Sequence, residues 1–438
     1  MKIFRSHFVQ SFLALLSVHA GTLVGGTLLP IAMARIVGAE ALGIFATASS
    51  FGLLLLAIID WGYETRLPLL VSQTPDDVSS YIGAAQRAKT RLWLLATSVL
   101  AGGYGVFMLV HRNTAAPQSL PYLALPVLLY GVWALVRALT MTYSHALRGL
   151  QHFGIIARVE NSLTFASHLL AVGLLAAPLV ISFAISPSLV VSAVVACLIA
   201  GEALKSIVFV RYLQHENRHT SEEHPAPPSS SISSGVIPLS MEHLVFVMMQ
   251  ALSVVQSRAG IYALTLLATQ IEVGYFSAVA RFTIALRILP GALFNVLLPR
   301  FVRSPQPETL RKALLLGGCI GAIGSAALYV CAGGLIWLIY GERFAHLMPL
   351  LRVVAWLFLL QTLVNILEPY LLAHKAEHFV NGTLAMALCV FAGMCVLFPV
   401  DTAYKAAFAS VGMEIILVVV YGVKSLILLP QKKSASMP

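Results

Sequence analysis

The sequence predicts an all-α polytopic membrane protein with twelve transmembrane helices in two six-helix bundles. Of its 438 residues, 58% are hydrophobic and only 11% are charged, and the mean hydropathy is +0.86. Soluble domains carry roughly a quarter charged residues. The apolar residues gather in runs of about 20, which is the length that crosses a bilayer as a helix. Lys and Arg gather in alternate breaks between these runs.

The first span illustrates how each run is assigned. The chain begins with a basic stretch and an apolar run, which resembles a signal peptide, but the run continues through Pro30 to Met33 and is too long for one. Reading the remaining runs in the same way places spans at 8–33, 41–59, 92–110, 120–147, 154–178, 187–210, 240–268, 274–299, 313–340, 348–373, 378–398 and 403–429.

The orientation of the spans follows from their basic flanks. Seventeen Lys and Arg residues lie in the breaks on the side of the N-terminus, and four lie on the opposite side. Cytoplasmic loops carry the excess of basic residues, so both termini are predicted to be cytoplasmic. The same rule accounts for most of the net charge of +10, and we expect no nucleic-acid partner.

Only residues 215–235, rich in Ser, Pro and charge, have the composition of a linker. This segment divides the chain into an N-terminal bundle, 1–214, and a C-terminal bundle, 236–438. Two six-span bundles are the layout of transporters built from repeated halves, whose substrate site lies between the halves near the bilayer midplane.

Signs of an enzyme are missing from the sequence. The five cysteines lie in apolar runs without a CxxC pair, and there is no DxD pair, Walker A sequence or cluster of metal ligands. The longest other polar stretch, 60–91, is too short for a folded catalytic domain. We therefore expect no catalytic residue, no cofactor and no metal site.

Five stretches, taken in order, resemble the bacterial polysaccharide flippases, the Wzx-like exporters that share a superfamily with the MATE multidrug antiporters and the lipid II flippases. The stretches are "LLPIAMARIVGAEALGIFATASSF" (28–51), "DWGYETR" (60–66), "HALRGLQHFGIIARVEN" (145–161), "VGYFSAVARFTIALRILPGALFNVLLPRF" (273–301) and "LIYGERFAHLMPLLRVVA" (338–355).

The resemblance implies a MATE-like fold and a flippase that exports lipid-linked glycans, such as O-antigen units, in polysaccharide biosynthesis. Its cargo would be an undecaprenyl-diphosphate-linked glycan in the bacterial cytoplasmic (inner) membrane. Other implied partners are membrane lipid, H+ or Na+ as a coupling ion, and a polysaccharide polymerase or export machinery.

The seventh span has a polar face. At 100° per residue, His243, Gln250 and Ser257 lie within roughly 40° of one another, and Thr265 and Arg258 flank them. Lipid offers such a face no partners, so we expect it to point into the bundle or an aqueous cavity. Many relatives carry an acidic residue two positions after this arginine, where the present chain has Gly260.

Two further arginines, Arg281 and Arg287, lie in the eighth span. A guanidinium can bind phosphate oxygens bidentately in a low-dielectric site, so these arginines and Arg258 are candidates to hold the cargo diphosphate. Alternatively, each arginine pairs with a buried carboxylate, of which Glu160, Glu202, Glu242, Glu368 and Glu414 are available. Lys205 is spaced to engage Glu202 at i, i+3, and Arg137 and Arg352 could serve helix packing.

Glu368 precedes Pro369 near the end of the tenth span, with Gln361 and Asn365 on its face. It is a candidate for ion coupling, or else a helix-end carboxylate paired with His374 or Lys375. In the first span, Gly25 allows close helix approach and Pro30 allows a bend, so both are candidates for gating as well as for packing.

Two other functions stay open. A cation-coupled multidrug exporter of the same fold should carry Asp and Glu in its cavity, whereas Asp occurs here only at loop edges. A membrane-embedded glycan polymerase or transferase should carry a large extracytoplasmic loop, and none is predicted.

Overall fold

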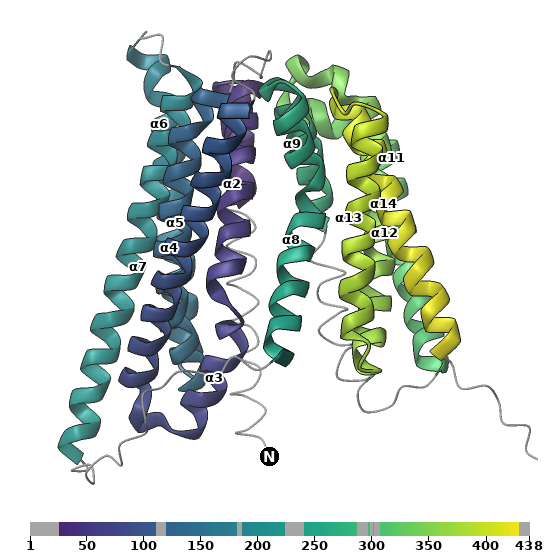
Figure 1. The fold of residues 1–438 in the computed structure, drawn as a ribbon. Helices are drawn as coiled ribbons and strands as arrows, with labels where there is room; N and C mark the ends of the chain where they lie inside the picture. The colour runs from purple at the N-terminus through teal and green to yellow at the C-terminus, as the bar shows by residue number, and fades with distance from the viewer. Residues whose placement is uncertain are drawn as a thin grey trace, which may run out of the picture. The chain divides into compact units, whose positions relative to one another are not determined.

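The computed structural model describes residues 26–110, 120–181, 186–223, 241–286, 297, 301 and 307–428. These residues form an all-helical structure (Figure 1). After an apolar helix Gly26–Ile36, the α-helices are α2 (Ala39–Asp60), α3 (Tyr63–Gln73), α4 (Val78–Val110), α5 (Leu120–Gly149), α6 (Phe153–Ile181), α7 (Pro187–Glu223), α8 (Met241–Leu267), α9 (Gln270–Leu286), α11 (Pro307–Tyr340), α12 (Met348–Ala373), α13 (Glu377–Leu397) and α14 (Ala403–Leu428).

Eight of the helices in this part of the chain are long and apolar enough to cross a membrane. They comprise α2, α11, α13 and α14 with stretches that include most of α5, α6, α7 and α12. The chain is therefore a multi-pass membrane protein. The count of twelve spans and the side on which the termini lie stay predictions, because most of the first predicted span and part of the eighth fall outside the described residues.

The stretch 60–91, expected to be a polar loop, is mostly helical. Helix α3 buries Leu67 and Val71 against Ala146 and Leu147 of α5, and a short 3-10 turn then leads into α4. Helix α4 begins at Val78, fourteen residues before the predicted span at 92. The apolar side of α3 is enough to hold it on the bundle, although its average hydropathy is that of a loop.

The described residues form two compact units. The first unit is Met1–Ile36 with Ala48–Val247, and the second is Val37–Thr47 with Met248–Pro438. Residues 37–47 thus belong to the second unit, although the sequence places them in the N-terminal bundle. Helix α7 also continues through residues 215–223 of the predicted linker, and residues 224–235 lie outside the described part.

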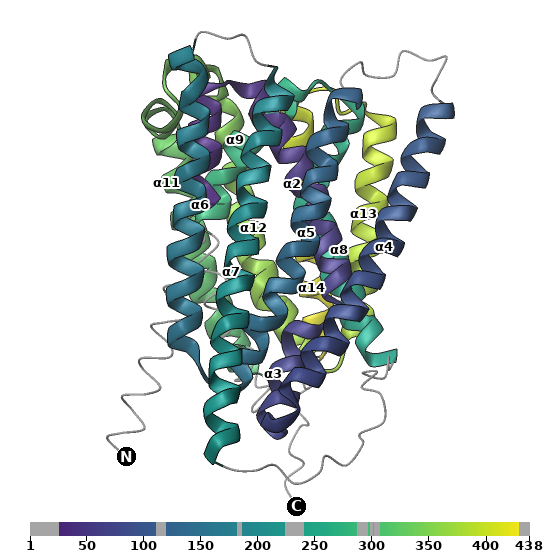
Figure 2. The ribbon, with the colours of Figure 1, turned by 90° about the vertical axis from the view of Figure 1, so that its left-hand side faces the viewer.

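In the first unit, α5, α6 and α7 pack side by side, and α3 closes the end at which α4 begins (Figure 2). Gly149, at the end of α5, touches α3: a Cβ there would lie 2.7 Å from the carbonyl oxygen of Pro68. The indole nitrogen of Trp93 in α4 donates to the carbonyl of Gly131 in α5 at 2.8 Å. These contacts fix the helices that carry the unit's buried charges.

In the second unit, α11, α12 and α14 form the main layer, with α8, α9 and α13 against it. The Ser325 hydroxyl of α11 donates to the carbonyl of Ala355 in α12 at 2.8 Å and accepts from the amide of Leu359 at 3.1 Å. Glu272 of α9 accepts from the amide of Ala403 at 2.7 Å and so caps α14.

Residues 37–47 join the second unit through backbone contact with α9. A Cβ at Gly43 would overlap the carbonyl oxygen of Gln270, and a Cβ at Gly274 would overlap that of Ala39. The turn between α8 and α9 lies at residues 268–269, so Gly274 is inside α9 rather than at the predicted start of a span. Two glycines therefore bring α2 and α9 closer than any side chain allows.

Candidate functional site

Part of the predicted polar face of α8 lies on the surface of the structure. Gln250 and Ser257 are exposed, and Arg258 is half-buried, with its charge acting on Tyr262 one turn further. The Ser257 hydroxyl donates to the carbonyl of Val254 at 3.0 Å. His243 lies in the first turn of α8, and its side chain is outside the described part.

The flank of this face is used for packing. Thr265 is buried, and its hydroxyl lies 2.9 Å from that of Thr47 in α2. The Thr47 hydroxyl also donates to the side-chain oxygen of Gln270 at 3.2 Å. All three residues belong to the second unit, so Thr265 stabilises the contact between α2 and the turn after α8.

Packing explains why position 260 carries glycine. Gly260 is buried, and a Cβ there would lie 2.6 Å from the Phe276 ring of α9 and 3.1 Å from the Ser410 hydroxyl of α14. A carboxylate at this position would have to displace both neighbours. The chain thus has no room for an acidic residue two positions after Arg258.

A buried polar cluster of the second unit was missed by the sequence reasoning. Glu414 of α14 is 2% exposed and accepts hydrogen bonds from the side-chain amides of Gln256 in α8 and Gln361 in α12. Gln256 lies about 100–120° around α8 from the exposed Gln250 and Ser257. The sequence offered Glu414 only as a counter-ion for an arginine, and its amide partners come from helices over a hundred and over fifty positions away.

Of the two arginines predicted in the eighth span, the structure describes only Arg281. Arg281 lies on α9, half-buried, and its charge acts on the hydroxyl of Tyr340 in α11. Tyr340 donates to the carbonyl of Ala278 at 3.0 Å. Arg287 lies outside the described residues. The structure therefore places Arg258 and Arg281 on two successive helices of one unit.

Glu368 is half-buried in α12, where its charge acts on Tyr421 of α14. Its expected neighbours are engaged elsewhere, because Gln361 donates to Glu414 and the Asn365 amide donates to the carbonyl of Gln361 at 2.8 Å. The Nδ1 atom of His374 lies 2.8 Å from the carbonyl of Tyr370.

Of the gating candidates, Gly25 lies outside the described residues, and Pro30 is buried in the helix Gly26–Ile36.

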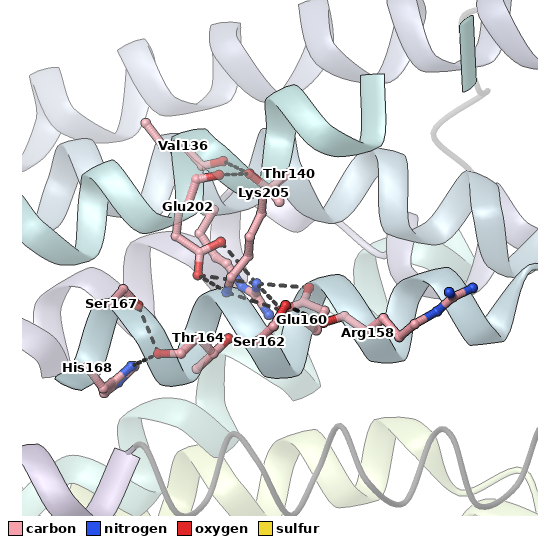
Figure 3. A network of polar contacts seen from close by, with 11 residues as sticks. Val136, Thr140, Arg158, Glu160, Ser162, Thr164, Ser167, His168, Glu202 and Lys205 are labelled. Carbon is pink, nitrogen blue, oxygen red and sulfur yellow. Dashed lines mark hydrogen bonds and ion pairs between the residues drawn. The ribbon is translucent and has the colours of Figure 1, made fainter. Parts of the chain in front are cut away.

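The first unit holds a network of four buried or nearly buried charges (Figure 3). Arg137 of α5 binds both Glu160 of α6, at 3.1 Å, and Glu202 of α7, at 3.0 Å. Lys205 of α7 reaches the same two carboxylates, at 3.2 Å and 2.8 Å. Two cations and two anions thus balance, and the predicted contact between Lys205 and Glu202 is confirmed.

A second set of buried charges joins α2, α4 and α5 in the same unit. Lys89 is fully buried, and its ammonium donates to Asp60 at 2.8 Å and to the carbonyl of Ala138 at 3.1 Å. The Nε2 atom of His145 lies 3.9 Å from Asp60. Within the described ranges, no group of three or more His, Cys, Asp or Glu side chains is placed to hold a metal ion.

Comparisons with known proteins identify the fold. No protein-family model matches the sequence, and no curated protein matches it. Among solved structures, the lipid II flippase MurJ, in an inward closed conformation, is similar with a TM-score of 0.66 and 11% identity, over 96% of this chain and 88% of the flippase.

Two MATE structures are similar at lower scores. An inward-facing multidrug resistance MATE family transporter of the MOP superfamily gives a TM-score of 0.51 and 14% identity, over 95% of this chain and 97% of the transporter. A MATE in complex with MaL6 gives 0.50 and 13%, over 94% and 95%. At such identities the likeness is one of fold: the chain has the fold shared by the lipid II flippase MurJ and the MATE transporters of the MOP superfamily.

Proposed function

We propose that the chain is a flippase of the Wzx-like kind and not an enzyme. It moves a polyprenyl-diphosphate-linked oligosaccharide, a polysaccharide repeat unit, from the cytoplasmic to the periplasmic leaflet of the bacterial inner membrane by alternating access. The sugar head crosses in a polar cavity while the polyprenyl tail stays in the bilayer. The likeness to a lipid II flippase over 96% of the chain supports this class of cargo.

The observation that carries the proposal is the exposed polar face of α8. The side chains of Gln250 and Ser257 are exposed, and the neighbouring Arg258 is half-buried. We take α8 to be a spanning helix, as the sequence predicts for residues 240–268. Lipid offers polar side chains no partners, so a spanning helix keeps such a face where water or a polar cargo can meet it. We assign to this face, with His243, Arg281 and Arg287, the binding of the diphosphate.

The charge of the cargo fits arginine. A guanidinium presents paired N–H donors that match phosphate oxygens, and this pairing is stronger away from water. Export is also favoured by the membrane potential, since moving one negative charge outward gains ~2.3 kcal/mol per 100 mV.

The buried carboxylates of the first unit argue against the multidrug alternative. Glu160 and Glu202 are both bound by Arg137 and Lys205, and Asp60 is bound by Lys89. A carrier of cationic drugs needs carboxylates that its own cations do not neutralise. These three are neutralised within the first unit, so they do not supply such a site.

Coupling to H+ or Na+ would use a carboxylate of the second unit. Glu368 was proposed from the sequence, and Glu414 is a second candidate because it is more deeply buried and accepts hydrogen bonds from the neutral amides of Gln256 and Gln361. Bending of the first span at Gly25 and Pro30 stays a proposal for gating. So does contact with a polymerase or other export machinery.

Deleting the gene and analysing both lipid-linked intermediates and surface glycan tests the function. We expect complete repeat units to accumulate on the cytoplasmic leaflet and surface glycan to fall. Raised sensitivity to cationic drugs with normal glycan would favour the multidrug exporter. Full export of short, unpolymerised units would favour a polymerase.

A further inference from the structure

A groove near one end of the second unit combines a cation with apolar side chains. It has a volume of about 360 Å³ and is lined by Tyr329 of α11, by Pro349, Arg352 and Trp356 of α12, by Phe408 of α14 and by two valines. Arg352 is its one charged lining residue. It is the fifth residue of α12, about 6 Å along the helix axis from Met348.

Arg352 forms no ion pair with any residue that the structure describes. Its guanidinium lies 5.3 Å from the centre of the Tyr329 ring, and its buried Nε atom has no hydrogen-bond partner. No carboxylate pairs with it among the described residues, and the first turn of α12 has no acidic residue. Asp401, just before α14, is bound by Lys405 at 2.7 Å, and this hydrogen bond lowers the pKa of the Asp401 carboxyl.

The groove also exposes large apolar side chains around this charge. Tyr329 is 44% exposed, Trp356 53% and Phe408 61%. Tyr and Trp rings are enriched at the level of lipid headgroups, where their apolar faces meet acyl chains, and Phe408 adds a further apolar ring. A ligand that fits must therefore carry one compact negative charge next to hydrocarbon.

We propose that this groove is a binding site for a resident anionic phospholipid, with the phosphodiester on Arg352 and the acyl chains against Trp356 and Phe408. One guanidinium matches the single negative charge of a phosphodiester, whereas a diphosphate would need more than one cation. This site is separate from the cargo face of α8, and the inference does not rest on the proposed function.

Lipid quenching of Trp356 tests the site in the full-length protein reconstituted into vesicles. Brominated phosphatidylglycerol is compared with brominated phosphatidylcholine, and the Trp356 signal is the difference between the wild type and Trp356→Phe. We expect the anionic lipid to be preferred about tenfold, as one charge-assisted contact gives. Arg352→Gln should bring the preference close to one, and Arg352→Lys should keep part of it.

Arg343→Gln is the matched control, because Arg343 is an exposed arginine in the 3-10 turn just before α12. It should leave the preference unchanged. Equal quenching by the two lipids in the wild type, or an undiminished preference in Arg352→Gln, would overturn the site. Release of the quenching by a short-chain polyprenyl diphosphate, more effectively than by phosphatidylglycerol, would overturn the assigned occupant.

If Trp356→Phe fails to fold, native mass spectrometry of the wild type and Arg352→Gln tests the same site. Retention of one fewer phosphatidylglycerol in Arg352→Gln supports the site, and equal retention refutes it.

Discussion

The two units satisfy their buried polar groups in different ways. In the first, Arg137 and Lys205 face Glu160 and Glu202, so that cations and anions balance across three helices. In the second, the buried carboxylate of Glu414 is held by the neutral amides of Gln256 and Gln361.

The arginines of the two units have different neighbours. Arg137 of the first unit is bound by two carboxylates, and Arg258 and Arg281 of the second lie on α8 and α9, where their charges act on Tyr262 and Tyr340. A balanced set of charges binds no further ion and acts as a structural device. We infer that the first unit uses its balanced charges for packing.

The largest expected effect is on stability, from breaking the balance in the first unit. Arg137→Met leaves two carboxylates with only Lys205, and removing one partner of a buried ion pair costs about 3–5 kcal/mol. Unfolding of the purified protein in detergent, followed by circular dichroism, measures the loss.

The double variant Arg137→Met/Glu160→Gln is the matched control, because it keeps the pair of Lys205 and Glu202 with zero net charge. It should recover most of the stability lost in the single variant. A double variant as unstable as the sum of the two single variants would show that charge balance is not what stabilises this unit.

The second largest effect should arise where the second unit brings backbones together. Gly43→Ala places a Cβ against the carbonyl of Gln270, and overpacking of this kind typically costs about 1–3 kcal/mol. Gly382→Ala in α13 is the control, since a Cβ there meets nothing within 4 Å. Equal unfolding curves for the two variants would mean that α2 and α9 are not in close contact.

The smallest effect should follow from neutralising Glu414. Glu414→Gln retains an oxygen that can accept from Gln256 and Gln361, so we expect a loss of about 1 kcal/mol, the net value of an ordinary hydrogen bond. The measurement is the same detergent unfolding. A loss as large as that of Arg137→Met would remove the distinction between the units.

Local spacing was sufficient to predict part of this structure. Hydropathy predicted an all-helical membrane protein, and the i, i+3 spacing predicted the contact between Lys205 and Glu202. The network around that pair was not predictable, because Arg137 and Glu160 reach it from two other helices. The pairing of Gln256 with Glu414 also depends on how three helices meet.

Hydropathy averaged over a window gave the wrong expectation where one face of a helix determines its packing. Helix α3 was expected to be a loop because its composition is polar, yet two buried side chains hold it against α5. Gly260 was noted as a departure from the related sequences, but its cause, the Phe276 ring, is visible only in the packed structure.

The most direct test of the proposed function is the leaflet distribution of lipid-linked repeat units in cells that carry Arg258 variants. A membrane-impermeant glycan-cleaving enzyme, added to spheroplasts, reports the outer-leaflet fraction, with Arg311→Ala as an exposed-arginine control on α11. We predict that Arg258→Ala lowers the outward rate about tenfold or more, as expected for the loss of a charge-assisted contact, and that Arg258→Lys retains part of it. Wild-type transport by Arg258→Ala, at an equal protein level in the membrane, would contradict the assignment of the α8 face to the cargo.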